Sequence, residues 1–305
     1  MTESTRPLFS GAFTALVTPM KQGDAGAPKV DDDALARLVE RQIAGGIDGL
    51  VPVGTTGESA TLSPREHVHV VKLVTEVARG RVPILAGAGA NNTAEAIELT
   101  RACAELGVAG TLHVTPYYNK PTQEGLVAHF TAIADAVDLP IVLYNVPSRT
   151  SCDMAPETVA TLARHRNIVG IKEATGDMHK AARIRELCPP PFAVLSGDDF
   201  SLLPFLSLGC DGVISVVSNV IPGELARLCA AARDGRMDEA RALHFRQLAL
   251  SRALFTVVNP IPVKAALAML GLCGPAIRLP LVPLDPASAH GRAVAEALRT
   301  LAIEA

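Results

Sequence analysis

The sequence predicts an α/β protein built as a (β/α)8 TIM barrel with a C-terminal helical extension. Two observations support this fold class. Short apolar runs rich in β-forming residues alternate with longer helical patterns from residue 11 to residue 233, and strands joined by helical crossovers form a parallel sheet. Polar and reactive residues also gather directly after the predicted strands, which is where barrel enzymes place their active sites.

Eight predicted strands alternate with eight predicted helices. Strands are expected at 11–20, 49–53, 83–88, 110–114, 140–146, 168–174, 192–197 and 212–216. Helices are expected at 33–46, 63–78, 92–106, 122–137, 156–164, 178–187, 199–208 and 222–233. The helix starts carry capping signals, because Ser63, Pro64 and Glu66 fit the N-cap, N1 and capping-box positions. Asn92 and Glu95 have the same capping-box spacing.

Three further helical patterns, at 237–250, 260–270 and 285–303, follow the eighth unit. We therefore divide the chain into a barrel domain at 1–234 and a C-terminal helical region at 235–305, which covers one face of the barrel or builds an oligomer interface. A doubly wound open sheet is the structural alternative. It usually has a glycine-rich phosphate turn after its first strand, whereas here Thr18-Pro19-Met20 follows.

The composition argues against nucleic-acid and membrane partners. The chain has 28 basic and 31 acidic residues, a net charge of −3, 4% aromatic residues and no tryptophan. It therefore lacks a basic footprint and base-stacking platforms. No stretch approaches the roughly 20 apolar residues of a spanning helix, and residues 1–10 lack the apolar core of a signal peptide. We expect a soluble, cytoplasmic protein.

The cysteine and histidine spacing gives no metal site. The six cysteines are widely separated and form no C-x-x-C pair, which favours buried, reduced thiols over zinc ligands. His67 and His69 stand two apart on one predicted helix, so they do not share a face. We expect neither a metal nor an organic cofactor.

Lys172 is the strongest candidate for a catalytic residue. It follows Ile168-Val169-Gly170-Ile171 within an apolar strand, and an inward-pointing lysine there is costly unless it is paired or functional. Burial disfavours the charged ammonium, and a neutral amine can attack a carbonyl to form an imine. The alternative is a strand-end lysine whose amine reaches solvent.

The polar blocks at the strand ends resemble a known family. They are GTTGES at 54–59, TPYYNKPTQEG at 115–125, YNVPSRT at 144–150, GIKEATGD at 170–177 and NPIPVK at 259–264. In this order they are similar to the dihydrodipicolinate synthase / N-acetylneuraminate lyase family over nearly the full chain. The arginine of YNVPSRT resembles the branch that condenses pyruvate with L-aspartate 4-semialdehyde, a step towards diaminopimelate and lysine.

The resemblance implies catalytic roles for five residues. Lys172 would form the imine with pyruvate, and Thr55 and Thr56 would hold the pyruvate carboxylate. Tyr144 would be the central acid and base, and Thr56 would join its proton relay. Tyr118 would complete that relay and would come from a neighbouring subunit.

The resemblance also implies a binding pocket and an assembly. Arg149 would bind the carboxylate of the aldehyde, since guanidinium suits bidentate recognition. Gly197 and Ile214 would line the keto-acid pocket. The chemistry would need no metal or cofactor, and the family implies a homotetramer built from tight dimers.

Some family members are inhibited by lysine near a subunit interface, and the resemblance maps that site here. The matching positions are Ala60, Leu62, His67, Asn91, Glu95 and Tyr117. Glu95 and His67 would meet the charged groups of the ligand. Pro64 stands where inhibited relatives often carry histidine, and Glu95 also fits a capping box, so the sequence leaves feedback inhibition open.

Three other functions compete with this interpretation. The first is an aldolase, lyase or dehydratase that acts on another 2-keto acid, such as a sugar acid or a hydroxyproline derivative. The second is a non-catalytic barrel that binds keto acids, against which the intact lysine, tyrosine, threonine and arginine set argues. The third is a phosphate-binding barrel, which is disfavoured because Asp198 and Asp199 would repel a phosphate.

Overall fold

The computed structural model describes residues 6–23 and 26–303. Its main sheet has eight parallel strands in the order β4-β1-β10-β9-β8-β7-β6-β5. They are β1 (Gly11–Ala15), β4 (Gly49–Val51), β5 (Leu85–Gly87), β6 (Gly110–Val114), β7 (Ile141–Asn145), β8 (Ile168–Glu173), β9 (Ala193–Ser196) and β10 (Gly212–Ser215). A parallel bridge between Leu50 and Ile84 joins the two edge strands. The sheet thus closes into the predicted barrel.

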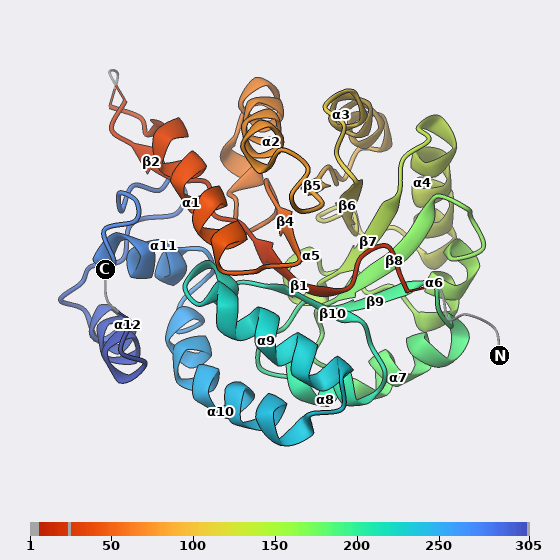
Figure 1. Cartoon of the computed structure of the whole chain (residues 1–305). Helices are drawn as coiled ribbons and strands as arrows, with labels where there is room; N and C mark the ends of the chain where they lie inside the picture. The colour runs from red at the N-terminus through yellow and green to blue at the C-terminus, as the bar shows by residue number, and fades with distance from the viewer. Residues whose placement is uncertain (1–5, 24–25, 304–305) are drawn as a thin grey trace.

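Helices surround this barrel on the outside (Figure 1). The barrel helices are α1 (Asp32–Ala44), α2 (Pro64–Ala78), α3 (Thr93–Glu105), α4 (Gln123–Ala136), α5 (Pro147–Thr150), α6 (Pro156–Leu162), α7 (Met178–Leu187), α8 (Leu202–Ser207) and α9 (Pro222–Arg233). The C-terminal helices are α10 (Met237–Leu254), α11 (Ile261–Met269) and α12 (Ala289–Thr300). Two short 3₁₀ turns, η1 (Ser59–Thr61) and η2 (Val217–Asn219), complete the set.

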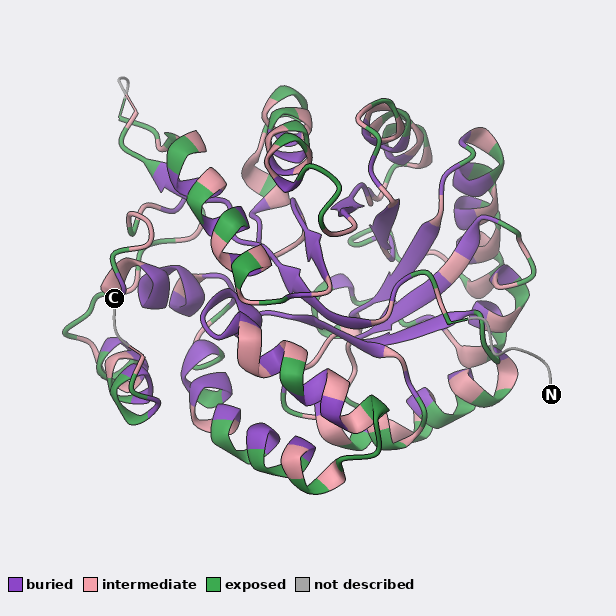
Figure 2. Ribbon diagram, in the orientation of Figure 1, coloured by how far each residue is buried: buried purple, intermediate pink, exposed green. Residues whose placement is uncertain are grey.

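The strands are buried on both faces, because side chains fill the barrel interior and the helices cover its outside (Figure 2). The capping box predicted at the start of α2 is present, with the Ser63 hydroxyl accepting from the Glu66 N–H and the Glu66 carboxylate accepting from the Ser63 N–H. At α3 the prediction was only half right. The Asn92 side chain caps the helix through the Ala94 N–H, and Glu95 is not part of that hydrogen bond.

The structure corrects the first predicted strand. The strand expected at 11–20 ends at Ala15, and Met20 then pairs with Val30 in an antiparallel hairpin. This hairpin consists of β2 (Met20–Lys21) and β3 (Lys29–Val30). The sequence showed one strand-like run, and the break within it was missed.

Two predicted helix starts were also too early. Helix α8, the seventh of the predicted helices, begins at Leu202 rather than at Asp199, because the Asp199 carboxylate accepts from the N–H groups of Val216 and Val217. The last helix begins after its N-cap Ser288, whose hydroxyl accepts from the Gly291 N–H.

The C-terminal helices pack against the barrel. Helix α10 packs on α9 and α12, and α11 packs on α12 (Figure 1). Leu250, Val263, Leu267 and Val294 belong to the same apolar cluster as barrel residues such as Val70. The helical extension is therefore confirmed, whereas the boundary at residue 234 stays a prediction. Among the described residues, no helix combines the length and the apolar character that crossing a membrane would need.

Two buried histidines lie between the sheet and its helices. His113 is on β6, and burial lowers its pKa to about 3. His129 is on α4, and burial lowers its pKa to about 4. Its Nδ1 lies 2.9 Å from the Thr93 hydroxyl. Both rings are therefore held neutral in the folded protein at pH values where an unfolded chain would protonate them.

We expect the free energy of unfolding to fall as the pH drops from about 6.5 to about 4. In this window His129 stays neutral in the folded state but binds a proton in the unfolded state, where its pKa is near 6.5. His129→Gln should make the urea midpoint depend less steeply on pH in this window, where the neutral His113 ring still contributes, and His69→Gln, at an exposed position, should leave the dependence unchanged. An unchanged profile in His129→Gln would contradict this assignment.

Candidate active site

The site begins with the pairing of two neighbouring strands. In the parallel register of β7 and β8, Tyr144 lies opposite Lys172. The Lys172 Nζ is 4.3 Å from the centroid of the Tyr144 ring. Both residues are buried, with 6% and 7% of their surface exposed. The amine and the phenol therefore meet near the carboxyl ends of their strands, as the sequence predicted for a catalytic lysine.

A cavity of about 190 Å³ opens around this pair. Its walls come from the ends of several strands and include Thr55, Thr56, Tyr144, Arg149, Lys172, Gly197, Asp198, Val216, Phe255 and Asn259. A Cβ atom at Gly197 would lie 2.9 Å from Cε of Lys172 and 2.5 Å from Cβ of Ala174. Only glycine at 197 therefore leaves room for the amine, which explains its position in the predicted pocket.

Thr56 and Arg149 both contact Asn259. The Thr56 hydroxyl is buried and accepts a hydrogen bond from Nδ2 of Asn259 at 3.0 Å. The Arg149 guanidinium donates to the backbone carbonyl oxygen of Asn259 at 3.4 Å. Asn259 belongs to the NPIPVK block of the family resemblance, but no role was predicted for it. Its burial beside two predicted site residues was visible only in the structure.

Two predicted site residues are not brought to the cavity wall. Ile214 is buried among the apolar side chains that pack around Tyr144, and Val216 lines the cavity instead. Tyr118 is 90% exposed, with a backbone φ of 73°, and does not line the cavity that contains Lys172. Both roles stay predictions.

A buried ion pair anchors the loop that carries the two threonines. Glu58 follows them in the left-handed region, with φ 57°. Its carboxylate accepts from Nζ of Lys264 at 2.5 Å, and each side chain is 1% exposed. Lys264 also donates to the Thr18 carbonyl at 3.1 Å, and burial lowers its pKa. Helix α11 thus fixes the GTTGES loop, a link that the sequence analysis missed.

A second cavity, of about 470 Å³, is lined by Thr55, Glu58 and Ser59 of the same loop. Its walls include five of the six predicted effector residues, namely Ala60, Leu62, His67, Glu95 and Tyr117, together with Pro64. Asn91 is next to it and donates through Nδ2 to the Tyr117 carbonyl at 3.1 Å. The two cavities share Thr55, Val146, Arg149 and Asn259 as wall residues.

Burial and hydrogen bonding set the protonation of His67 and Tyr117 in this second cavity. Nε2 of His67 donates to the Gly87 carbonyl at 2.7 Å, and burial lowers the His67 pKa. The ring is therefore neutral, with Nδ1 as its acceptor. Burial, followed by the nearby Glu95 charge, raises the pKa of Tyr117. Within residues 6–23 and 26–303, no three histidine, cysteine, aspartate or glutamate side chains gather as a metal site.

The closed barrel and the polar cavity at the carboxyl ends of its strands define a (β/α)8-barrel enzyme. A model of the Dihydrodipicolinate synthetase family matches residues 8–299. The chain belongs to this family.

Individual relatives agree with this assignment. The 4-hydroxy-tetrahydrodipicolinate synthase of Pelobacter propionicus is 53% identical over 281 residues, which cover 92% of this chain and 95% of the relative. A chloride-inhibited dihydrodipicolinate synthase from Acinetobacter baumannii, complexed with pyruvate, has a TM-score of 0.92 and 46% identity over 96% of this chain and 99% of that one. The enzyme from Cyanidioschyzon merolae with lysine bound has a TM-score of 0.93 and 43% identity, covering 98% and 100%.

We expect Lys264→Met to lower the free energy of unfolding by about 3–5 kcal/mol, because it leaves the Glu58 carboxylate buried without its positively charged partner. The double variant Glu58→Gln/Lys264→Met should lose less than the single one. Lys72→Met, which removes an exposed pair with Glu76, should change stability by less than about 1 kcal/mol. Urea unfolding of the unmodified protein, Glu58→Gln, Lys264→Met and the double variant measures the coupling. If the stability losses of the two single variants add up to the loss of the double variant, the two side chains do not stabilise each other and the ion-pair assignment is wrong.

Proposed function

We propose that the protein is a lyase that condenses pyruvate with L-aspartate 4-semialdehyde to 4-hydroxy-tetrahydrodipicolinate. It would act in the cytoplasm, in diaminopimelate and lysine biosynthesis. The observation that carries the proposal is the buried Lys172 amine beside Tyr144 in a small polar cavity. The curated relatives named for this activity support it, and six free cysteines suit a reducing compartment.

In the proposed reaction, Nζ of Lys172 attacks the ketone carbon of pyruvate, and the ketone oxygen leaves as water. The resulting protonated imine withdraws electrons, so the pyruvate methyl group loses a proton and becomes an enamine. The enamine carbon then forms a bond to the aldehyde carbon, and the aldehyde oxygen takes up a proton to become a hydroxyl group. The amino group of the aldehyde substrate then attacks the imine carbon and closes the ring, and Nζ of Lys172 leaves as the free amine. Tyr144, in contact with the amine, would move the protons of these steps.

Thr55 and Thr56 would hold the pyruvate carboxylate, while Gly197 lines the pocket and Ile214 would act on it from behind, through the apolar cluster that contains Tyr144. The hydrogen bond from Asn259 also has a consequence for the relay. Because the Thr56 oxygen accepts from Nδ2, its own proton is free to be donated elsewhere. It would therefore be directed towards Tyr144 or the substrate, as a proton relay requires.

The charges on the cavity wall favour an amino-acid aldehyde over a sugar acid. Arg149 and Asp198 carry opposite charges and line the same cavity as Lys172. We assign the carboxylate of the aldehyde to Arg149, and Asp198 would suit its ammonium group. A sugar acid offers hydroxyl groups and no ammonium. The alternative keto-acid substrates therefore fit these walls less well.

We further propose a homotetramer made of two tight dimers. Tyr118 supports an assembly, because a phenol that is 90% exposed cannot take part in a relay unless another subunit receives it. In this proposal Tyr118 enters the cavity of its neighbour. Sedimentation velocity with activity measured across the dilution series tests this, and a fully active monomer would contradict it.

The second cavity supports a second role, as a site for L-lysine. A Glu95 carboxylate and a neutral His67 acceptor line one hollow, which suits a ligand with ammonium groups. The structure of a relative with lysine bound supports the same idea. Its shared walls with the first cavity would let a bound ligand influence the substrate site.

We expect pyruvate and borohydride to add a stable group to Lys172, identified by peptide mass mapping. Lys172→Ala should lose this adduct and all turnover, because no other group supplies the amine. Turnover is measured with pyruvate and L-aspartate 4-semialdehyde, in an assay coupled to the reductase that consumes the product. An adduct elsewhere, or activity only with a sugar acid, would overturn the proposal.

Arg149→Ala is the matched control for that experiment. It leaves the amine and its phenol in place, so trapping with pyruvate should persist while use of the aldehyde weakens. Loss of trapping in this variant would contradict the assignment of Arg149 to the aldehyde.

We expect L-lysine to bind with measurable heat in titration calorimetry, and Glu95→Gln to weaken that binding about 10-fold, as the loss of one charged hydrogen bond would. Glu98→Gln, one turn further along the same helix, is the control and should bind lysine normally. If the unmodified protein shows no heat with lysine, the effector site is wrong.

A further inference from the structure

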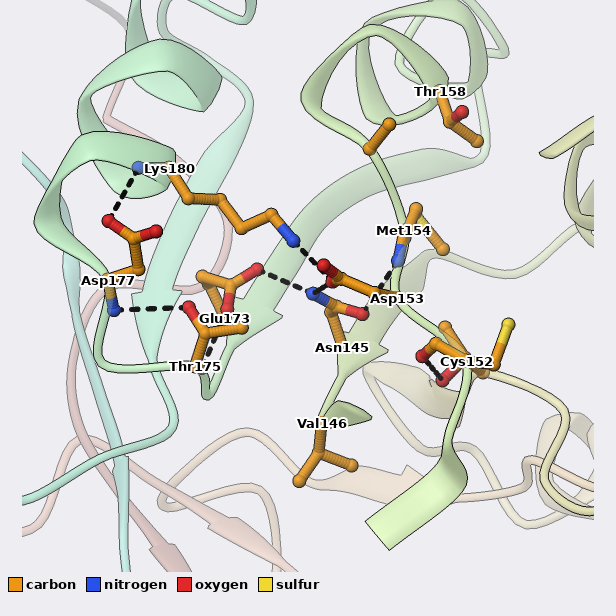
Figure 3. A network of polar contacts seen from close by, with 12 residues as sticks. Asn145, Val146, Cys152, Asp153, Met154, Thr158, Glu173, Thr175, Asp177 and Lys180 are labelled. Atoms are coloured by element: carbon orange, nitrogen blue, oxygen red, sulfur yellow. Dashed lines mark hydrogen bonds and ion pairs between the residues drawn. The ribbon is translucent and has the colours of Figure 1, made fainter. Parts of the chain in front are cut away.

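Behind the Lys172–Tyr144 pair, the same two strands carry a second, outward-facing pair. Successive side chains of a strand point to opposite faces. Since Tyr144 and Lys172 face the cavity, Asn145 and Glu173 face the surrounding helices, and the register places these two opposite each other as well. Both are buried, with at most 2% of their surface exposed. Figure 3 shows their side chains in contact.

Each oxygen of the Glu173 carboxylate accepts a hydrogen bond. Oε2 accepts from Nδ2 of Asn145 at 2.9 Å, and Oε1 accepts from the N–H of Thr175 at 2.7 Å. The carboxylate therefore joins β7, β8 and the loop that follows β8. A carboxamide of the same shape would have to place its NH₂ group against one of these two donors.

The Asn145 side chain is also fully used. Besides Glu173, its Nδ2 donates to Oδ1 of Asp153 at 2.9 Å, and its Oδ1 accepts from the N–H of Met154 at 3.0 Å. Asp153 in turn pairs with Lys180 of α7 (Figure 3). A buried polar network with all its members satisfied rigidifies the segments that it joins.

This arrangement holds the Arg149 loop at both of its ends. Residues 146–153 leave β7 directly after Asn145, pass through α5 with Arg149, and return to the Asn145 side chain at Asp153 and Met154. One side chain thus fixes the exit and the return of the loop.

We propose that Glu173 and Asn145 are positioning residues for the reaction. They hold Lys172 against Tyr144 across the two strands, and they hold the loop that presents Arg149. Neither side chain lines the substrate cavity. Their effect on catalysis passes through geometry, since misplacing a reacting group by about 1 Å can cost on the order of 100-fold in rate. The proposal rests on the imine chemistry proposed above.

The first test is Glu173→Gln, followed by the rate of borohydride trapping with pyruvate and by kcat. We expect both to fall by about 10-fold or more, because the new NH₂ group faces a donor and pushes the strands out of place. Glu157→Gln is the control, since it weakens an exposed pair with Arg183 on a neighbouring helix. It should trap pyruvate at the normal rate.

A reciprocal swap separates positioning from a general loss of stability. In Glu173→Gln/Asn145→Asp the carboxamide and the carboxylate exchange places, so a donor again faces an acceptor across β7 and β8 and the net charge is unchanged. The new carboxylate at position 145 also meets the Asp153 carboxylate, so the swap restores the strand contact but not the anchor of the loop. We expect the double variant to trap pyruvate at least about 3-fold faster than Glu173→Gln, even if its melting temperature does not recover. No gain in the trapping rate would contradict the proposal.

Asp153→Ala tests the loop separately, and it carries the proposal if Glu173→Gln does not fold. Asp153 is half-exposed, and its removal takes away one of the two hydrogen bonds that hold the return of the loop, while the Met154 bond and the Glu173–Asn145 bond remain. We expect a KM for the aldehyde about 5-fold higher or more, with pyruvate trapping unchanged. An unchanged KM would overturn the loop assignment.

The failures of the two proposals are distinguishable. If the unmodified protein forms no adduct on Lys172, the imine chemistry itself is wrong. If it forms the adduct and Glu173→Gln forms it equally fast, only the positioning proposal fails.

Discussion

The parallel pairing of β7 with β8 is the constraint on which the site depends. It places Tyr144 opposite Lys172 on the inner face and Asn145 opposite Glu173 on the outer face. A shift of one residue would turn each pair to the other face, so the register decides at once where the amine, the phenol and their supporting carboxylate lie. The barrel makes this register rigid, because each of these strands also pairs with a further neighbour.

The C-terminal region supplies the second constraint, from α11 and the turn that precedes it. Asn259 contacts the Thr56 hydroxyl, and Lys264, a few residues later, neutralises Glu58. The threonine loop therefore depends on residues about 200 positions away in the sequence. A buried ion pair is a weak source of net stability, but breaking it is costly. Its effect here is to keep one loop in one place.

The sequence predicted the barrel because its signals were local: strand and helix periods, capping residues and polar blocks at strand ends. The same signals located Lys172, Tyr144, Thr56 and Arg149 on one cavity. Long-range partners left no such signal. Lys264 stands in an apolar helical segment, and nothing near it in the sequence indicates that Glu58 neutralises it. The break after Ala15 was missed for the same reason, since the hairpin at Met20 is stabilised by its pairing with Val30.

The two cavities share walls, and this limits how a ligand in one can act on the other. Glu58 lines the second cavity and is held by Lys264 and by the Arg278 backbone N–H, so a movement of the whole loop would break a buried ion pair. Arg149 is freer, because it is anchored to Asn259 by a single hydrogen bond of 3.4 Å. A ligand shifts a conformation only as far as its affinities for the two states differ. The least costly route between the cavities is therefore a change in the Arg149 side chain, which lines both.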